Sequence, residues 1–379
     1  MKKVIILFLL LGMLFSGGCW DWQIIDELAM IFAMGIDEAE GEPELLQITV
    51  TNPSFAENAD EPRTINTVRA YSLTQALINL QHQKDKQPVL GKLDVFIFSE
   101  DVARSGAMHQ ILRQYDQGRD TNPRVLLCIV RGATAQEVLN LSLPQEPRTA
   151  VFLGSMLRQG LSNGRIPEIN AITYWVQYNT PGIANVIPVI ELTGPGDENK
   201  GLLLTGLAVI DESGRMQGYL SDAETLIYMM LTGNIKRGRF YTHLDYMEQK
   251  NRVLTAFLQK SSVKVESSIV RGKPVIDIKA DITLDGLNVD LVIDTQLKED
   301  FFSGLEQALA RDFQGNIRRV LKKSQEWEAD IVGLGQHVRV QHPKWFREKD
   351  WASEYRQSEI NVEVKVTIKR FGSLVNPNY

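Results

Sequence analysis

Short apolar runs alternate with segments of helical period along the first half of the chain. Four of the apolar runs predict strands, at residues 27–37, 44–53, 93–100 and 124–132. The polar turn EAEGEPE separates the first two runs. After Ser72, apolar residues recur every three or four positions, which predicts a helix with this hydroxyl as its N-cap. Residues 108–115 predict a second helix. Strands that alternate with helices indicate mixed α/β layering in roughly the first 140 residues.

Two more helices are expected before the strongest break in the chain. Residues 134–143 predict a short helix, and residues 155–169 predict a helix that ends in a turn with glycine. The stretch GPGDENKG at 194–201 then combines glycine, proline and charged residues, which disfavour regular structure. We expect a domain boundary there.

The second half of the chain carries the period-two pattern of a sheet with one wet face. A hairpin around the turn DESGR is expected within residues 206–220, followed by a helix capped by Ser221 or Asp222. Apolar and polar residues alternate over 263–295 and again over 360–368. Between them, apolar positions three and four apart predict a long amphipathic helix: Leu305, Leu309, Phe313, Ile317, Val320 and Leu321. An antiparallel sheet covered on one face by this helix is the simplest arrangement.

The fold class expected from these patterns is α+β. A mixed α/β region would be followed by a C-terminal antiparallel sheet packed against the long amphipathic helix, in two or three lobes. The length agrees, because 379 residues exceed what one hydrophobic core usually serves. The expected division is residues 1–18 as a signal peptide, 19–200 as an N-terminal domain of one or two lobes, and 201–379 as a C-terminal α+β domain.

The N-terminus has the pattern of a secretory signal. Lys2 and Lys3 precede an apolar segment that ends near Phe15, and this segment is shorter than the roughly 20 residues of a spanning helix. The following stretch SGGC is similar to the lipobox of bacterial lipoproteins, whose signal peptidase cuts before the cysteine. We therefore expect cleavage between Gly18 and Cys19, with a diacylglyceryl thioether and an N-palmitoyl chain on Cys19. The alternative is an ordinary signal cut nearby that leaves Cys19 a free thiol.

Composition and charge narrow the class of protein. A hydrophobic content of 44% and a charged content of 23% are typical of globular proteins. The net charge of −6 gives no reason to expect nucleic acid as a partner. The second cysteine, Cys128, lies in the apolar run VLLCIV, so no intramolecular disulfide is expected once Cys19 is acylated. No later stretch reaches spanning length, so we expect a water-soluble body held to a membrane at one end.

No catalytic or metal-binding constellation stands out in the sequence. The five histidines are scattered, outside any HExxH or zinc-type spacing: His82, His109, His243, His337 and His342. His337 and His342 are close enough in sequence to share a metal, but solvent-facing strand or loop histidines are the preferred interpretation. SSVK at 261–264 matches the loose SxxK pattern of serine acyl-transferases without its companion motifs. Three aspartates are expected on the wet face of one strand: Asp277, Asp281 and Asp285. We expect no enzyme activity, no metal and no cofactor.

Tryptophans near both ends of the chain allow two interpretations each. Trp20 and Trp22 flank the expected lipid site, where they would lie at headgroup level or belong to a flexible tether. Trp345, Phe346 and Trp351 form either an exposed docking surface or part of the C-terminal core, and core packing against the long helix is preferred.

GCWDWQIIDELAMIFAMGID begins with a cysteine that is followed by Trp, Asp, a short polar link and a predicted strand. It is similar to the mature start of the Ger(x)C spore germination lipoproteins, the C subunits of nutrient germinant receptors, in which this cysteine bears lipid. Further blocks follow in the family's order: SLTQALINL, VLGKLDVFIFSEDVA, GRIPEI, VIPVIEL, GLAVIDESGRMQGYLSDAET, EWEADIVGLGQHVRVQHPKWF and EINVEVKVTIKRFG. Lys92, Leu334 and the stretch QGRDTNPR depart from the family pattern. The blocks cover nearly the whole chain.

The resemblance implies a non-enzymatic receptor subunit on the outer face of the cytoplasmic membrane, which is the spore inner membrane. Its partners would be two integral membrane subunits and membrane lipid, the latter through acylated Cys19. Its role would be receptor assembly or signalling in spore germination. Two rival classes remain: a solute-binding lipoprotein of a nutrient importer, with two similar α/β lobes about a hinge, and an anchored hydrolase, with titratable groups gathered in a pocket.

Overall fold

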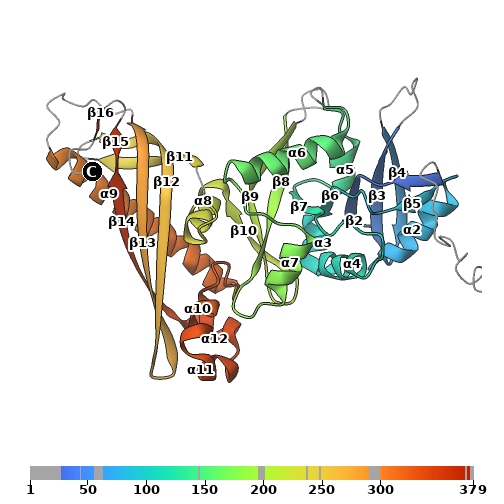
Figure 1. Ribbon diagram of the computed structural model, residues 1–379. Helices are drawn as coiled ribbons and strands as arrows, with labels where there is room; N and C mark the ends of the chain where they lie inside the picture. Colours follow the sequence, from blue (N-terminus) through green and yellow to red (C-terminus); the bar gives the residue numbers. More distant parts are fainter. Residues whose placement is uncertain are drawn as a thin grey trace, which may run out of the picture.

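The chain forms two lobes of different architecture that lie side by side along the molecule (Figure 1). The computed structural model describes residues 27–42, 44–54, 63–143, 146–194, 201–235, 238–246, 249–289, 299–371 and 374–375. The expected signal peptide, Gly18, Cys19, Trp20 and Trp22 lie outside the described residues. Among the helices that are described, none combines the length and apolar character needed to cross a bilayer.

The N-terminal lobe is built on an eight-stranded mixed sheet. In spatial order the strands are β10 (Met216–Ser221), β9 (Gly201–Ile210), β8 (Asn185–Thr193), β7 (Leu126–Arg131), β6 (Val95–Ser99), β2 (Ala33–Glu38), β3 (Leu46–Pro53) and β4 (Arg63–Ala70). Strands β8, β7, β6 and β2 run parallel, and the outer strands pair antiparallel. A parallel pair, β1 (Leu28–Met30) and β5 (Gln87–Val89), fastens the start of the described chain to this lobe.

Helices cover both faces of this sheet. One face carries α2 (Leu73–His82), α3 (Glu100–Ser105), α4 (Ala107–Asp116) and α7 (Ala171–Tyr178). The other carries α5 (Ala135–Asn140), α6 (Thr149–Ser162) and α8 (Asp222–Leu231). All five residues of β6 are buried, because a central parallel strand has a helical layer on each side. The uninterrupted apolar run of this strand follows from that double burial.

Local sequence signals set the helix starts as expected. The Ser72 hydroxyl accepts the N–H of Gln75 at 3.1 Å, so Ser72 is the N-cap of α2. Ser221 caps α8, and the Glu224 carboxylate accepts the backbone N–H of Ser221 at 2.9 Å, which completes a capping box. Both N-cap predictions are confirmed.

The C-terminal lobe consists of a six-stranded sheet and one long helix. Its strands are β11 (Gly238–Tyr246), β12 (Gln249–Val270), β13 (Lys273–Val289), β14 (Glu359–Ile368), β15 (Arg370–Phe371) and β16 (Leu374–Val375). The helix α9 (Glu299–Glu326) packs its apolar stripe on one face of this sheet. All the apolar positions predicted to alternate on β13 are buried: Ile276, Ile278, Ala280, Ile282 and Leu284.

The predicted α+β fold class is confirmed, with one refinement in the second sheet. The β12–β13 hairpin is antiparallel, whereas β14 joins β13 in parallel over ten residue pairs, from Val275↔Glu359 to Leu284↔Ile368. A parallel pairing requires a long crossover. Here the crossover contains α9 and three short helices, α10 (Leu334–Gln341), α11 (Pro343–Arg347) and α12 (Trp351–Gln357).

The short helices α10 to α12 form a small cluster beside the tip of the β12–β13 hairpin (Figure 1). Phe346 and Trp351 are buried, with ring centroids 5.6 Å apart, and Trp345 is half-buried with its indole N–H 3.2 Å from the carbonyl of Gly272. The prediction that these aromatic residues belong to the core is confirmed for Phe346 and Trp351, and Trp345 lies at the edge of this core.

Strands on the two sides of residue 200 pair with each other in the same sheet. β8 ends at Thr193, and β9 begins at Gly201 and pairs with it antiparallel. The β9–β10 hairpin predicted around DESGR is confirmed, and it extends the N-terminal sheet. The boundary predicted at residue 200 stays a prediction about where two domains divide.

Candidate functional site

The side chains that the structure describes among the candidates for catalysis or metal binding are not brought together. In the described part of the chain, no group of three or more His, Cys, Asp or Glu side chains could hold a metal ion. His337 lies on helix α10, so the expectation of a strand or loop position is wrong for this residue. The ring of His342 is 2.9 Å from the carbonyl oxygen of Ser267. A hydrogen-bond partner on the backbone gives His342 a structural role.

The serine and aspartates of the second sheet also have structural partners. Ser261 lies on β12, and its hydroxyl donates to the carbonyl of Met230 at 3.1 Å. Asp285 accepts two hydrogen bonds from Arg370, at 2.7 and 2.8 Å, and Asp277 accepts one from Asn361 at 3.0 Å. These contacts link β13 to the strands beside it, which is the role of polar groups on the wet face of a sheet.

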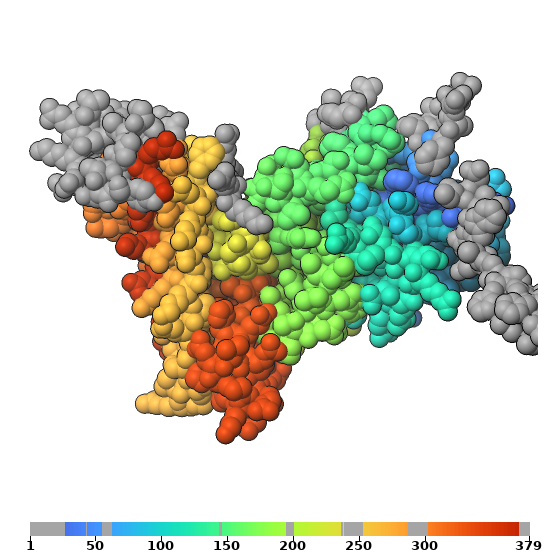
Figure 2. Space-filling view, viewed as in Figure 1, coloured from blue at the N-terminus to red at the C-terminus, as the bar shows by residue number. Residues whose placement is uncertain are grey.

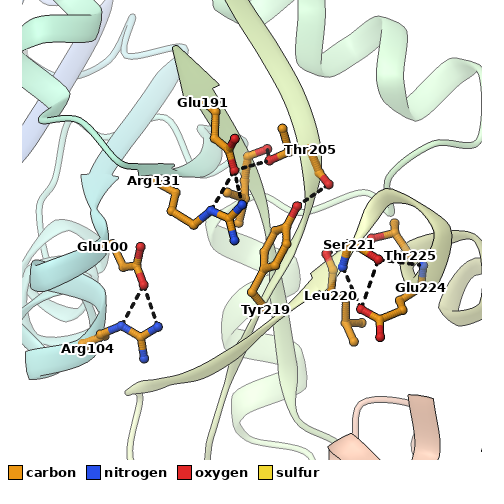
Figure 3. Close-up of polar contacts among 11 residues, drawn as sticks. Glu100, Arg104, Arg131, Glu191, Thr205, Tyr219, Leu220, Ser221, Glu224 and Thr225 are labelled. Atoms are coloured by element: carbon orange, nitrogen blue, oxygen red, sulfur yellow. Dashed lines mark hydrogen bonds and ion pairs between the residues drawn. The ribbon is translucent and has the colours of Figure 1, made fainter. Parts of the chain in front are cut away.

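A cluster of paired charges lies at the carboxyl ends of β7 and β8 (Figure 3). The Nε of Arg131 is 2.7 Å from a carboxylate oxygen of Glu191, and its guanidinium carbon lies 3.9 Å from the ring centroid of Tyr219. The Tyr219 hydroxyl donates to the carbonyl of Thr205. The Arg131 charge is therefore neutralised and stacked within the lobe, an arrangement that fixes β10 against β7 and β8.

The same close-up shows Glu224 in its capping contact with Ser221. The Glu224 carboxylate also forms an ion pair with Lys323 of α9, in the other lobe. Burial would raise the pKa of Glu224, but the Lys323 ammonium and the Ser221 N–H hold the pKa of this carboxyl below its ordinary value. α8 and α9 are thereby joined across the two lobes.

A second contact between the two lobes lies around Asp330, which follows α9. The carboxylate of Asp330 accepts the backbone N–H groups of Gly333 and Gly335 at 2.9 and 2.7 Å, and the indole N–H of Trp351 at 3.0 Å. Burial raises the pKa of Asp330 to about 6 in spite of these donors. Its backbone carbonyl accepts the N–H of Ala184, at the start of β8, at 2.8 Å.

Glycines allow the backbones of the lobes to touch at this point. A Cβ on Gly182 would lie 2.6 Å from the carbonyl carbon of Gly335, and one on Gly335 would lie 2.6 Å from the Cα of Gly182. Gly218 of β10 leaves space for the indole of Trp327, since a Cβ there would be 2.2 Å from the ring. We call this contact region, formed by residues 182–184, Gly218, Trp327, 330–335 and Trp351, the lobe junction.

The lobe junction unites sequence blocks that are far apart in the chain. The blocks are VIPVIEL with the residues before it, GLAVIDESGRMQGYLSDAET, and EWEADIVGLGQHVRVQHPKWF. Its glycine, aspartate and tryptophan groups connect the two lobes through hydrogen bonds and close packing. The sequence signal was the pair of glycines after ADIV. Gly333 has a φ of 77°, and Gly335 has both the Trp351 indole and the backbone of Gly182 against it.

Two family models together match most of the chain. Residues 21–192 match the family model described as "Spore germination protein N-terminal domain", and residues 205–372 match "Spore germination B3/ GerAC like, C-terminal". Spore germination protein KC of Bacillus subtilis (strain 168) is 21% identical, over 99% of this chain and 97% of its own. Spore germination protein B3 of the same organism is 24% identical, over 98% of each chain.

A solved structure has the same fold. The crystal structure of the GerBC protein superposes with a TM-score of 0.59 at 19% identity, covering 89% of this chain and 98% of that one. The two family models together identify a spore germination protein with an N-terminal and a C-terminal family part. The chain belongs to the Ger(x)C family, the C subunits of germinant receptors, which is not a known enzyme family.

Proposed function

We propose that this protein is the membrane-anchored lipoprotein subunit of a spore nutrient germinant receptor. The observation that carries the proposal is the ordered match of both family parts, at 21–192 and 205–372, directly after a lipobox-like SGGC. Signal cleavage after Gly18 and acylation of Cys19 would hold it on the outer face of the cytoplasmic (spore inner) membrane. There it would serve receptor assembly or signalling, beside two integral membrane subunits.

Two features of the fold support this proposal over the importer alternative. A solute-binding protein would have two similar α/β lobes about a hinge, whereas here an eight-stranded sheet with helices on both faces adjoins a hairpin-based sheet with one long helix. The lobes are also joined by backbone contacts at residues 184 and 330 and by the Glu224–Lys323 ion pair. A joint of this kind suits a subunit that passes a movement on to its partners rather than one that closes around a solute.

A pair of cysteine variants tests the proposal in the spore-forming host. We expect Cys19→Ser to lack acyl chains by mass spectrometry, to leave the membrane fraction, and to abolish germination with the nutrient that the intact receptor senses. Cys128→Ala serves as the control, because it removes the other cysteine and leaves the lipid site intact. Germination that is unchanged both in Cys19→Ser spores and after deletion of the gene would overturn the proposal.

A further inference from the structure

Exposed apolar side chains gather on one helical layer of the N-terminal lobe. Ile78 of α2 is 48% exposed, and Ile172 and Val176 of α7 are 44% and 60% exposed. The opposite layer, α5, α6 and α8, exposes no large hydrophobic side chain among its described residues. The two helical layers of the lobe therefore differ in how many large hydrophobic side chains they expose.

Helices α2 and α7 also lack charged residues. Neither LTQALINLQH nor AITYWVQY contains Asp, Glu, Lys or Arg. Ile172 and Val176 are four residues apart, so they form one stripe on the outer side of α7. A helix whose outer face meets water normally carries charged residues there. In the same layer, α4 carries Arg113 and Asp116, and α3 carries Glu100, Asp101 and Arg104. The two cations and three anions leave these helices with a net charge of −1.

The helical layer and the hairpin tip lie on the same side of the molecule. Figure 1 shows α2, α4 and α7 along the lower side of the N-terminal lobe, and α10 to α12 and the β12–β13 turn extend on that side too. Figure 2 shows the segments of α4, α7 and α10 to α12 along the lower side in the same view. Exposed valines occur there as well, Val340 of α10 at 78% and Val270 at the hairpin turn at 51%.

The position of the expected lipid limits how far the membrane can lie from this side of the protein. Cys19 precedes Leu28 by nine residues, so its sulfur can lie at most about 30 Å from Leu28. Leu28 begins β1, whose partner β5 follows directly after α2 in the chain. A lipid leaflet that holds Cys19 is therefore within reach of the end of the lobe that carries α2.

We propose that the surface formed by Ile78, Ile172 and Val176, here called the α2–α7 face, rests on the lipid leaflet that holds Cys19. This inference depends on the acylation in the proposed function and adds the orientation of the body on the membrane. The contact is apolar, because Ile and Val side chains enter the boundary between headgroups and acyl chains. The few side chains involved bind only because the tether keeps them at high local concentration. Salt and anionic lipid therefore have little influence on it.

Single labelled cysteines on the acylated protein in phosphatidylcholine vesicles test this orientation. Buried Cys128 and acylated Cys19 leave the introduced thiol as the labelled one. A polarity-sensitive dye is placed at position 78 or 176, and at Val253 of β12 as the control, since Val253 is 43% exposed and pairs with β11 on the other side of the molecule (Figure 1). We expect brominated lipid to quench the dyes at 78 and 176 about two-fold or more above the control, at low and high salt alike.

The outcomes separate the orientation from the anchoring. Equal quenching at 78, 176 and 253 on vesicle-bound, acylated protein overturns the orientation and leaves the proposed function standing. Dyes at 78 and 176 that are shielded only when the membrane subunits are present overturn it too, because the α2–α7 face then binds protein. A protein without acyl chains that does not float with vesicles contradicts the proposed function itself.

Discussion

Ala184 of the N-terminal lobe donates its backbone N–H to the carbonyl oxygen of Asp330, which follows the long helix of the C-terminal lobe, over 2.8 Å. The carboxylate of the same aspartate binds the turn at Gly333 and Gly335 and the indole of Trp351. One buried residue thus organises the C-terminal side of the lobe junction and contacts the N-terminal side. The stability of the whole chain should depend on it.

The titration of Asp330 should appear in the pH dependence of stability. Burial raises the pKa of this carboxyl to about 6 in the folded protein, above its value in an unfolded chain. The folded state therefore binds this proton more tightly than the unfolded state does. The contribution of Asp330 to the unfolding free energy is favourable at low pH and is lost as the pH rises through 6. The unfolding free energy of wild type minus that of Asp330→Asn should fall by about 1 kcal/mol between pH 5 and pH 7.

Urea unfolding at the two pH values measures this difference. Asp281→Asn, which removes an exposed carboxylate from β13, is the control for loss of a surface charge. A wild-type-minus-Asp330→Asn difference that is the same at pH 5 and pH 7 contradicts the prediction.

The glycine contact at the junction should not tolerate a methyl group. Gly335→Ala places a Cβ 2.5 Å from the Trp351 indole nitrogen, and overpacking of this kind costs about 1–3 kcal/mol. Gly315→Ala in α9 is the matched control, because nothing lies within 4 Å of its Cβ. Alanine there should stabilise the helix by about 0.5–1 kcal/mol. A lower melting temperature for Gly335→Ala and a higher one for Gly315→Ala would support the close approach. A higher melting temperature for Gly335→Ala would disprove it.

The cap of α8 should matter more than the ion pair beside it. Ser221→Ala removes the side-chain cap of the helix and should lower the unfolding free energy by about 1 kcal/mol. Lys323→Met removes the ion-pair partner of Glu224. Because the Lys323 side chain is 38% exposed, the loss of unfolding free energy should stay below about 1 kcal/mol. Chemical denaturation of both variants compares the two losses. A larger loss in Lys323→Met would show that the interlobe ion pair is the stronger contact.

Thiol reactivity should report on both cysteines at once. Cys128 has no exposed surface, and burial raises the pKa of its thiol far above the ordinary value, so thiol reagents should not reach it in the folded protein. An acylated Cys19 has no thiol to offer. The native protein extracted from membranes should therefore show no reactive thiol, and unfolding in guanidinium should expose one. A thiol that reacts before unfolding indicates an unmodified Cys19 or an open core.

Local patterns predicted those elements whose burial follows a simple period. The alternation on β13 and β14, the stripe of α9 and the caps at Ser72 and Ser221 are encoded within a few residues each, because one face of each element meets the core. Strand β4 and helix α7 have weaker patterns and were not predicted. β4 has a mixed burial pattern, and α7 exposes Ile172 and Val176, so neither shows a clean period.

By itself the sequence determined the α+β class, most helices and strands, the expected lipid site and the family resemblance, because these depend on short motifs and local periodicity. Only the tertiary structure decided that β9 and β10 extend the first sheet, that β14 lies parallel to β13, and that Asp330 and Gly335 meet residues 182–184. Such contacts join residues up to about 150 positions apart, and their free energy depends on complementary shapes that no local pattern encodes.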